Sequence, residues 1–138
     1  MKQTNADSEE IVKMFEGQSI RVMERLTLDD GTLLVQSSFG SITYWINRYS
    51  GNTPTNVETG SLTVSDVIFN TAQLDAAWPD PVAGYNFMKR FAATNLIAVS
   101  GAKTTYRLKV RGQLSNGTRF WITKLAIQVL PLLTGSET

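Results

Sequence analysis

Hydrophobic and polar residues alternate along most of the chain from Gly17 onward, in short runs separated by turn residues. A period of two sends successive side chains to opposite faces of a strand, and is typical of a sheet with one buried face. About seven such strands, with no amphipathic helices between them, predict an all-β fold, an antiparallel β-sandwich. The runs that show this pattern cover residues 20–28, 32–36, 42–47, 62–69, 85–91, 104–113 and 118–130.

Turn-forming residues mark the connections between these runs. Asp29-Asp30-Gly31 predicts a tight turn, because Asp and Gly favour turn positions for backbone reasons. Residues 50–60 are rich in Gly, Asn, Thr and Pro, and they predict a loop or a weak edge connection. Residues 71–84 contain Pro79 and Pro81, so they cannot form a central strand, because each proline removes a hydrogen-bond donor from the ladder.

The N-terminal segment has a different pattern. Asp7 precedes Glu10 by three residues, as in a capping box, and Ile11, Met14 and Phe15 would share one face of a helix over residues 7–15. Such a short helix is marginal alone, so the segment either docks, on this domain or on a partner, or is a loose arm. The predicted organisation is an N-terminal arm or short helix at 1–16, a β-sandwich domain at 17–132 and a flexible tail at 133–138.

The last two strands are predicted to form a hairpin. Asn116-Gly117 indicates a two-residue loop, because both positions tolerate the positive φ that such a loop needs. On one face, the resulting register predicts core residues, with the Trp121 indole filling the space that Gly112 leaves. The predicted pairs on this face are Tyr106 with Ile127, Leu108 with Leu125, Val110 with Thr123, and Gly112 with Trp121.

The opposite face of the hairpin combines cations with apolar residues. Lys109 and Lys124 would be direct cross-strand neighbours there, which is mildly destabilising for like charges. The face is either a solvated surface or a contact surface for an acidic partner, with Phe120 and Ile122 at its centre. The predicted members are Arg107, Lys109, Arg111, Phe120, Ile122 and Lys124.

The charge distribution supports the second alternative. The formal net charge is only +1, but residues 1–82 hold eleven acids and five bases, net −6, whereas residues 83–138 hold one acid and eight bases, net +7. The two halves either interleave within the sandwich and cancel, or they make the molecule dipolar. In the dipolar case, subunits or partners could meet electrostatically.

The composition excludes much chemistry, because the chain has no cysteine and no histidine. Disulfides, thiolate nucleophiles and iron–sulfur clusters are impossible, and the commonest general base and metal ligand are missing. Asp29 and Asp30 lack the spaced oxygen ligands of a calcium loop. We therefore expect no enzyme, no catalytic residue, no metal and no cofactor. No stretch approaches ~18 apolar residues and no signal-peptide core is present, so we expect no membrane partner.

Two other binding functions have some support in the residues. Trp45, Tyr49, Trp78 and Tyr85 could form a stacking platform for a carbohydrate, although such residues in a small sandwich more often lie in the core or anchor loops. The basic face with Phe120 could bind nucleic acid. A single predicted aromatic on that face and an isoelectric point of about 8.0 argue against nucleic acid.

Several short motifs resemble the small immunoglobulin-like β-sandwich structural proteins of tailed bacteriophage virions. The resemblance implies an immunoglobulin-like sandwich that serves as a non-enzymatic building block and forms homo-oligomers, and it implies no catalytic residues. The absence of cysteine departs from antibody-type domains. The motifs are Leu28-Asp29-Asp30-Gly31, Ile42-Thr43-Tyr44-Trp45, Val67-Ile68-Phe69, Gly84-Tyr85-Asn86-Phe87 and Thr105-Tyr106-Arg107-Leu108, the last followed by the hairpin to Ile127.

The resulting expectation is a capsid decoration or cement subunit that is made in the host cytoplasm and binds the major capsid protein of the virion. A tail or baseplate structural module is the first alternative, and a carbohydrate-binding module that uses Trp45, Trp78 and Tyr85 is the second. The contacts are expected from the basic face of the hairpin and from the N-terminal segment. The residues in question are Arg107, Lys109, Arg111, Phe120, Ile122 and Lys124 on that face, and Ile11, Met14 and Phe15 in the segment.

Overall fold

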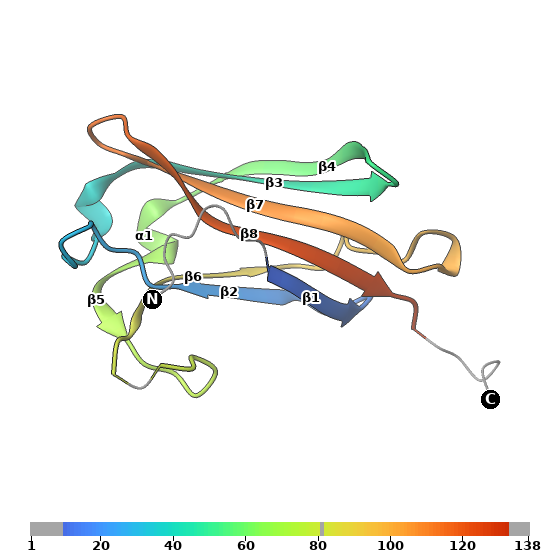
Figure 1. Ribbon diagram of the computed structural model, residues 1–138, viewed down its shortest axis with the longest axis horizontal. Helices are drawn as coiled ribbons and strands as arrows, with labels where there is room; N and C mark the ends of the chain where they lie inside the picture. Colours follow the sequence, from blue (N-terminus) through green and yellow to red (C-terminus); the bar gives the residue numbers. More distant parts are fainter. Residues whose placement is uncertain (1–9, 81, 133–138) are drawn as a thin grey trace.

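Two β-sheets pack face to face in the computed structural model, which describes residues 10–80 and 82–132 (Figure 1). Only short helical turns interrupt the strands: η1 (Gln36–Ser38), α1 (Val64–Val67) and η2 (Val99–Gly101). No helix in the described part of the chain is long and apolar enough to span a membrane. The strands are β1 (Glu10–Phe15), β2 (Ile20–Glu24), β3 (Phe39–Ser50), β4 (Thr53–Leu62), β5 (Ile68–Gln73), β6 (Tyr85–Phe91), β7 (Thr104–Leu114) and β8 (Arg119–Leu130).

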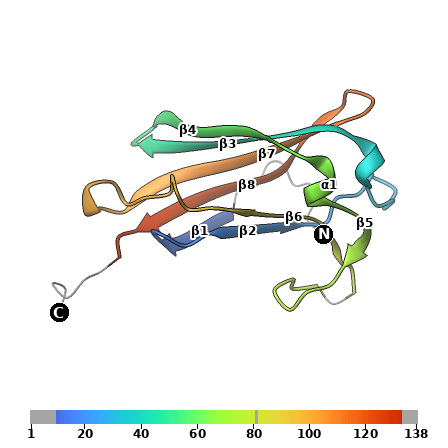
Figure 2. The same ribbon diagram turned by 180° about the vertical axis from the view of Figure 1, so that it is seen from behind.

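The strand order is that of an immunoglobulin fold. One sheet has the order β1-β8-β7-β3-β4 and the other β2-β6-β5, and Figures 1 and 2 show the two layers from both sides. Immunoglobulin strands B, E and D form one sheet, and G, F and C the other, with C′ beside C in variable-type domains. Strands β2 to β8 occupy the positions B, C, C′, D, E, F and G in chain order. The predicted all-β, immunoglobulin-like sandwich is confirmed.

Tyr106 adds a side-chain feature of the same fold. It is the third residue of β7, its side chain is fully buried, and its hydroxyl donates a 2.7 Å hydrogen bond to the carbonyl of Ile97. The same oxygen accepts a 3.1 Å bond from the Ile97 amide. This is the tyrosine corner of immunoglobulin domains, in which a cysteine follows two residues later on strand F. Here the apolar and fully buried Leu108 takes that position.

Inward-facing residues of both sheets form one core. Its largest fully buried members include Ile42, Ile46 and Leu108 from the five-stranded sheet and Phe87 from the three-stranded sheet. A buried amide at Asn86 fixes the adjoining loop, since it accepts a 2.6 Å bond from the Leu26 amide and donates to the carbonyls of Leu26 and Leu34.

The N-terminal helix predicted for residues 7–15 is wrong in its described part. Glu10–Phe15 form β1, which pairs in parallel with β8, and residues 7–9 lie outside the described residues. A helix this short has no independent stability, whereas the open edge of β8 supplies backbone partners for an extended segment. Residues 10–15 are therefore a strand of the sandwich itself. The predicted tail at 133–138 also lies outside the described residues.

Two central segments differ from the expected strands. Residues 53–62, within and just beyond the expected loop or edge connection, form edge strand β4 of the five-stranded sheet. The expected strand at 62–69 is wrong, because Val64–Val67 make a helical turn before β5 begins at Ile68. Val67 and Ile68 are consecutive and both buried, a pattern that strand alternation does not allow.

The last hairpin has a three-residue loop rather than the predicted two-residue loop. The Leu114 amide donates to the carbonyl of Thr118 at 2.8 Å, and Gly117 has a φ of +94°. A type I turn followed by a left-handed glycine is the usual three-residue arrangement. It pairs Arg111 with Trp121, a register one residue away from the expected one.

A β-bulge restores the predicted register farther along the hairpin. Val110 pairs with Thr123, so Ile122 is an extra residue on β8, and both Ile122 and Thr123 are buried. The predicted pairs of Val110 with Thr123, Leu108 with Leu125 and Tyr106 with Ile127 are confirmed. The predicted pair of Gly112 with Trp121 is wrong.

Candidate functional site

The outer face of the five-stranded sheet carries the most distinctive cluster of side chains. The strand register brings Trp45 beside Lys109, Lys109 beside Lys124, and Arg111 beside Trp121. Because directly paired residues point to the same side of a sheet, these side chains share one surface. We define the basic aromatic face by its members on β3, β7 and β8: Trp45, Tyr49, Arg107, Lys109, Arg111, Trp121 and Lys124.

Cations cover the aromatic rings of this face. The Arg111 guanidinium lies 5.0 Å from the ring centre of Trp45, and the Lys109 ammonium lies 5.6 Å from that of Trp121. The two indoles meet edge to face, with ring centres 6.0 Å apart and an interplanar angle of 70°. At exposed sites each cation–ring contact contributes about 0.5–1 kcal/mol, which offsets the repulsion between neighbouring cations.

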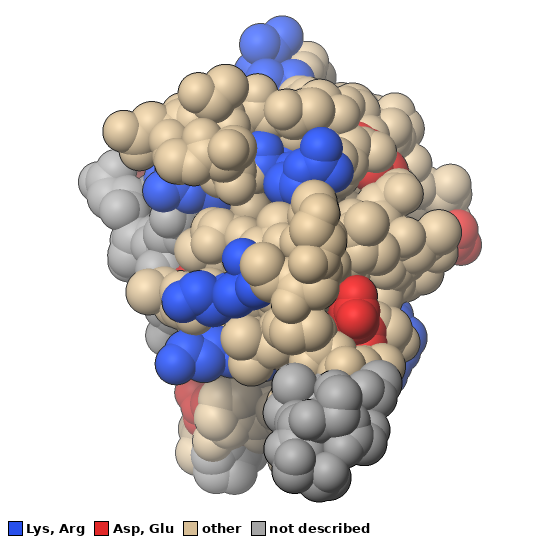
Figure 3. Space-filling model, turned by 90° about the vertical axis from the view of Figure 1, so that its right-hand side faces the viewer, with Lys and Arg blue, Asp and Glu red and all other residues tan. Residues whose placement is uncertain are grey.

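Arg107 and Tyr49 extend the cluster toward the other end of the sheet. The Arg107 guanidinium lies 4.7 Å from the ring centre of Tyr49. A view onto that end of the sandwich shows Lys and Arg side chains in several groups, with fewer Asp and Glu side chains, which lie mostly apart from them (Figure 3). The face therefore alternates rings and cations over much of its length.

Carboxylates in the described strands of this sheet point away from the basic aromatic face. They are Glu10, which pairs with the buried Leu125, and Glu58, which pairs with the buried Ile46. Glu58 accepts a hydrogen bond from the Tyr44 hydroxyl, and burial together with this bond raises the pKa of Tyr44 to about 12. Among residues 10–80 and 82–132, therefore, no strand carboxylate lies beside Lys109 and Arg111 on the outer face.

The predicted contact residues of the hairpin divide between the two faces. Arg107, Lys109, Arg111 and Lys124 lie together on the outer face, as predicted. Phe120 and Ile122 do not, because the shifted register turns both toward the core. Ile122 is only 3% exposed, and Phe120 packs against the core with its ring 6.0 Å from that of Phe39.

Gly112 explains why the Phe120 side chain, and not that of Trp121, lies on the inner face of the hairpin. A Cβ built on Gly112 would lie 3.0 Å from the ring of Phe39 and 3.2 Å from that of Phe120. The missing side chain therefore makes room for phenyl rings rather than for the indole that the sequence predicted. Trp121 was not predicted as a surface residue, because a left-handed Gly117 fits a two-residue loop as well as a three-residue loop. The longer loop follows from Asn116, which does not adopt the positive φ that the two-residue loop requires.

The three N-terminal candidates also differ in accessibility. Ile11 is 67% exposed and lies beside Ala126 on the outer side of β1. Phe15 is 41% exposed at the end of the strand. Met14 is 7% exposed and belongs to the core, because alternation on β1 turns it inward, so it is not on the surface where partner contact was predicted. Ile11 and Phe15 stay candidate contact residues.

The aromatic residues considered for carbohydrate binding do not form one platform. Trp45 and Tyr49 lie on β3, whereas Tyr85 begins β6 in the other sheet. Tyr85 is buried, with its ring 5.7 Å from that of Trp78, and the Trp78 indole nitrogen donates a 2.7 Å bond to the carbonyl of Ala83. Trp78 and Tyr85 therefore anchor a loop, and the fold separates the two pairs.

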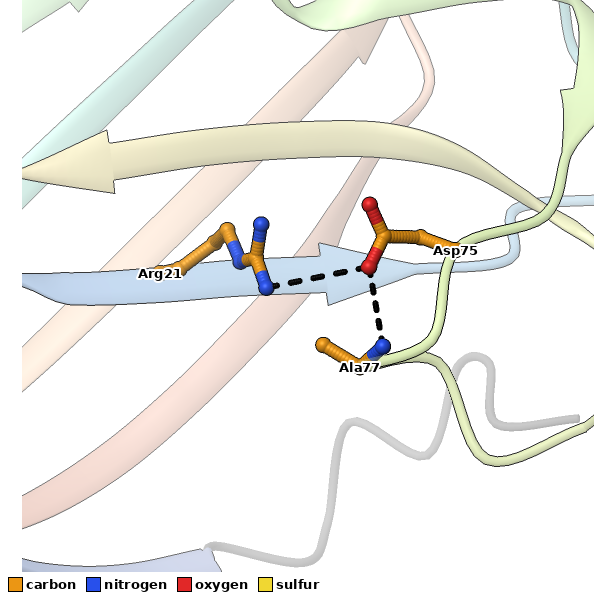
Figure 4. Close-up of polar contacts among 3 residues, drawn as sticks. All are labelled: Arg21, Asp75 and Ala77. Carbon is orange, nitrogen blue, oxygen red and sulfur yellow. Dashed lines mark hydrogen bonds and ion pairs between the residues drawn. The ribbon is translucent and has the colours of Figure 1, made fainter.

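A cavity of about 640 Å³ opens between β2 and the β1–β8 edge. Arg21 lies on its wall, and its guanidinium is 3.9 Å from the carboxylate of Asp75 (Figure 4). The same carboxylate oxygen accepts a 2.8 Å bond from the Ala77 amide, so the pair holds the loop that follows β5. Hydrogen bonds from the Ala83 and Val82 amides lower the pKa of Asp80 in that loop. These groups are engaged within the chain.

A smaller cavity of about 320 Å³ lies at the end of the sandwich where the β2–β3 loop meets the β7–β8 hairpin. Figure 1 shows both connections at this end. The lining is mostly apolar and includes Trp121, so the cavity adjoins the basic aromatic face. Its lining residues are Leu26, Thr27, Leu28, Asp29, Leu34, Leu114, Thr118, Phe120 and Trp121.

Asp30 binds the backbone of the turn in which it lies. Asp30 accepts a 2.9 Å bond from the Thr32 amide in the predicted turn, and hydrogen bonds from Thr32 lower its pKa. Residues 10–80 and 82–132 contain no group of three or more His, Cys, Asp or Glu that could hold a metal ion. The cations and rings of the basic aromatic face form an arrangement that can recognise an anionic group.

Comparisons with known proteins add little. No family model matches the chain, and no curated protein matches it. Solved structures that resemble it include extracellular domains of the voltage-gated sodium channel beta4 subunit, reported as parallel homodimers that explain a role in cell–cell adhesion. The two chains are 12% identical over 96% of this chain and 100% of the other, with a TM-score of 0.42. At this similarity the neighbour's adhesion role says nothing about what this chain binds.

Proposed function

We propose that the chain is a non-enzymatic binding module that docks the basic aromatic face against an acidic surface of a partner protein. One observation carries the proposal: Trp45 and Trp121 adjoin each other beneath Arg111 and Lys109, on a face without strand carboxylates in the described residues. Trp and Arg are the residues that most often dominate the binding energy of an interface, and opposite charge on the partner sets its register.

The ring geometry favours a protein over a nucleic acid or a sugar. Bases and sugars stack on open ring faces. Here Arg111 lies against the Trp45 ring and Lys109 against the Trp121 ring, and the two indoles meet edge to face. A carboxylate can instead approach these cations from outside without displacing them from the rings.

Charge also limits how copies of the chain can associate. A two-fold contact through this face would set the same cations against each other, because such an interface is self-complementary by symmetry. Like charges placed together across an interface oppose association. A two-fold homodimer would therefore use another surface, and the basic aromatic face would be left for a different acidic surface.

The setting that we propose is a bacteriophage particle, with the chain as a capsid decoration or cement subunit on the major capsid protein. The support is the sequence resemblance to small immunoglobulin-like virion proteins, together with a rigid sandwich that offers one charged docking face. A tail or baseplate module is the alternative. Gold labelling of the protein on purified particles separates the two, and its absence from particles would reject both.

Charge reversal tests the docking face directly. The probe is a fluorescein-labelled short peptide of alternating Glu and Ala, with binding followed by anisotropy at low ionic strength. Lys109→Glu with Arg111→Glu should weaken binding by about tenfold or more. The matched control reverses Lys89 and Arg90 on β6 of the other sheet, and should change affinity by less than about twofold, since rim or remote charges contribute little.

Three results would contradict the proposal. The first is equal weakening by the two double variants, which would mean that overall charge rather than this face binds the peptide. The second is tighter binding of an oligothymidylate than of the acidic peptide. The third is no measurable binding of the acidic peptide by the unmodified protein. Circular dichroism of both double variants confirms that each is folded.

A further inference from the structure

We infer that the 320 Å³ cavity beside Trp121 accepts one apolar side chain of the acidic partner. The inference rests on the proposed function, because it concerns the same docking face. Trp121 belongs to both features: it lines the cavity, and Lys109 lies 5.6 Å from the centre of its ring. A segment that lies over Lys109 and Arg111 therefore reaches the mouth of the cavity without leaving the surface.

The lining suits an apolar group. Leu26 and Leu34 at its base are buried, and Phe120 packs against the core. Leu28 stands at the mouth, where 45% of its surface is exposed. Water held against such walls has few hydrogen-bond partners, so an apolar side chain that displaces it binds favourably.

The volume and charge of the cavity limit further which kind of group can occupy it. At about 320 Å³, the cavity lies at the lower end of the roughly 300–1,000 Å³ range of ligand pockets, so it has room for one large apolar side chain such as Leu or Phe. Among the described residues of the lining, Asp29 is the one charged group, and it disfavours a carboxylate inside the cavity. The partner's carboxylates belong on the other side of Trp121, over Arg111 and Lys109. The partner segment therefore carries an apolar anchor next to acidic residues.

Hydrogen bonds hold the cavity open in the absence of a partner. On one side, the Leu28 amide donates to the carbonyl of Thr32 at 2.8 Å, and Thr27 forms a bridge with Leu33. Asn86 fixes the backbone of both Leu26 and Leu34 from below. A site that is already shaped avoids the cost of ordering on binding, which is the usual source of affinity in an anchor pocket.

Two acidic peptides that differ at one position test the inference. The first alternates Glu and Ala, and the second has Leu in place of the central Ala. The unmodified protein should bind the Leu peptide about tenfold more tightly, as burial of one leucine side chain predicts. Leu28→Ser should remove this preference while leaving the affinity for the Ala peptide unchanged.

Matched variants make the outcome specific. Leu74→Ser removes an exposed leucine, 65% accessible, that does not line the cavity, and it should preserve the tenfold preference. Thr118→Tyr places a ring at the cavity mouth and should abolish the preference as Leu28→Ser does. All three positions are exposed, so folding should be unaffected, which thermal unfolding checks.

The results separate the two proposals. A Leu preference that survives in Leu28→Ser and Thr118→Tyr overturns the cavity as anchor site, while the docking face still stands. Equal affinity of the unmodified protein for both peptides also overturns the cavity as anchor site and leaves the docking face standing. Failure of the unmodified protein to bind either peptide overturns the docking face itself. Binding of oligothymidylate that is lost in Leu28→Ser would assign the cavity to a nucleobase and overturn the apolar anchor.

Discussion

Cations on the three-stranded sheet and its loops bind polar groups of their own chain, whereas Lys109 and Arg111 on the five-stranded sheet lie against aromatic rings. Arg21 pairs with Asp75, and Arg25 donates a 2.8 Å bond to the carbonyl of Gly84. Arg90 donates a 3.0 Å bond to the hydroxyl of Ser19. Lys89 is the exception on that sheet, since it lies 5.9 Å from the ring centre of Phe91.

The difference distinguishes cations that bind groups of their own chain from cations whose donors stay available for a partner. A guanidinium that donates to a backbone carbonyl fixes a loop and has fewer donors left for a partner. A cation on a ring face keeps its hydrogen-bond donors, because the ring attracts it through its quadrupole. Polar groups around the three-stranded sheet should therefore matter mainly for stability, and Lys109 and Arg111 mainly for binding. Four experiments test this comparison.

Asn86→Ala should give the largest effect. The substitution leaves the Leu26 amide and the carbonyls of Leu26 and Leu34 without the side-chain partner that now binds them in a buried site. We expect a loss of about 3 kcal/mol in the free energy of unfolding, measured by urea denaturation. Asn56→Ala, at an exposed amide on β4, is the control and should cost less than about 0.5 kcal/mol. Similar losses in both variants would contradict the assignment.

Arg25→Ala and Arg111→Ala compare the two uses of arginine directly. Arg25→Ala removes a partly buried hydrogen bond to Gly84, so it should lower the free energy of unfolding by about 1 kcal/mol. Arg111→Ala removes only a contact with the Trp45 ring and should cost about 0.5 kcal/mol. Affinity for the acidic peptide should show the reverse order. Stability losses in the opposite order would break the comparison.

Asp80→Asn should give a smaller effect that depends on pH. Hydrogen bonds from the backbone amides of Ala83 and Val82 lower the pKa of Asp80 below its ordinary value of 3.8. A lowered folded-state pKa contributes stability above pH 3.8 and loses it as the pH falls through the folded value. The unmodified protein should therefore exceed the variant in stability at neutral pH, and the difference should shrink in acid. A difference that grows in acid would contradict this sign.

Lys109→Met should have the smallest effect on stability. It relieves the repulsion from Lys124 and removes the contact with the Trp121 ring, and these contributions oppose each other. The free energy of unfolding should change by less than about 0.5 kcal/mol. A loss above about 1 kcal/mol would mean that Lys109 stabilises the fold itself, and it would end the distinction between the two sheets.

The alternating pattern was sufficient for the fold class because a period of two has one physical cause, a half-buried sheet. It predicted β6 at its observed bounds and most of the β7–β8 pairing. It was insufficient at residues 10–15, where helical spacing and strand alternation both fit the sequence. The segment forms a strand rather than a helix because it pairs with the open edge of β8, and the local sequence does not reveal this tertiary partner.

The candidate site was predictable only in part for a different reason. The cations of β7 depend on alternation within one strand and were placed correctly on one face. Trp121 and Phe120 depend on the loop length and on the bulge at Ile122, and a shift of one residue exchanges the two faces of a strand. Trp45 comes from β3, so its place beside Trp121 required the tertiary order of the sheet.

The bulge at Ile122 changes by one residue which side chains of β8 point to each face of the sheet. Trp121 and Lys124 are three residues apart, and in an uninterrupted strand an odd spacing would send them to opposite sides. The extra residue restores them to the same side, while Ile122 and Thr123 both remain buried. Insertion or deletion of a single residue at this point could therefore change which chemistry the surface displays, with the hydrophobic interior of the hairpin conserved.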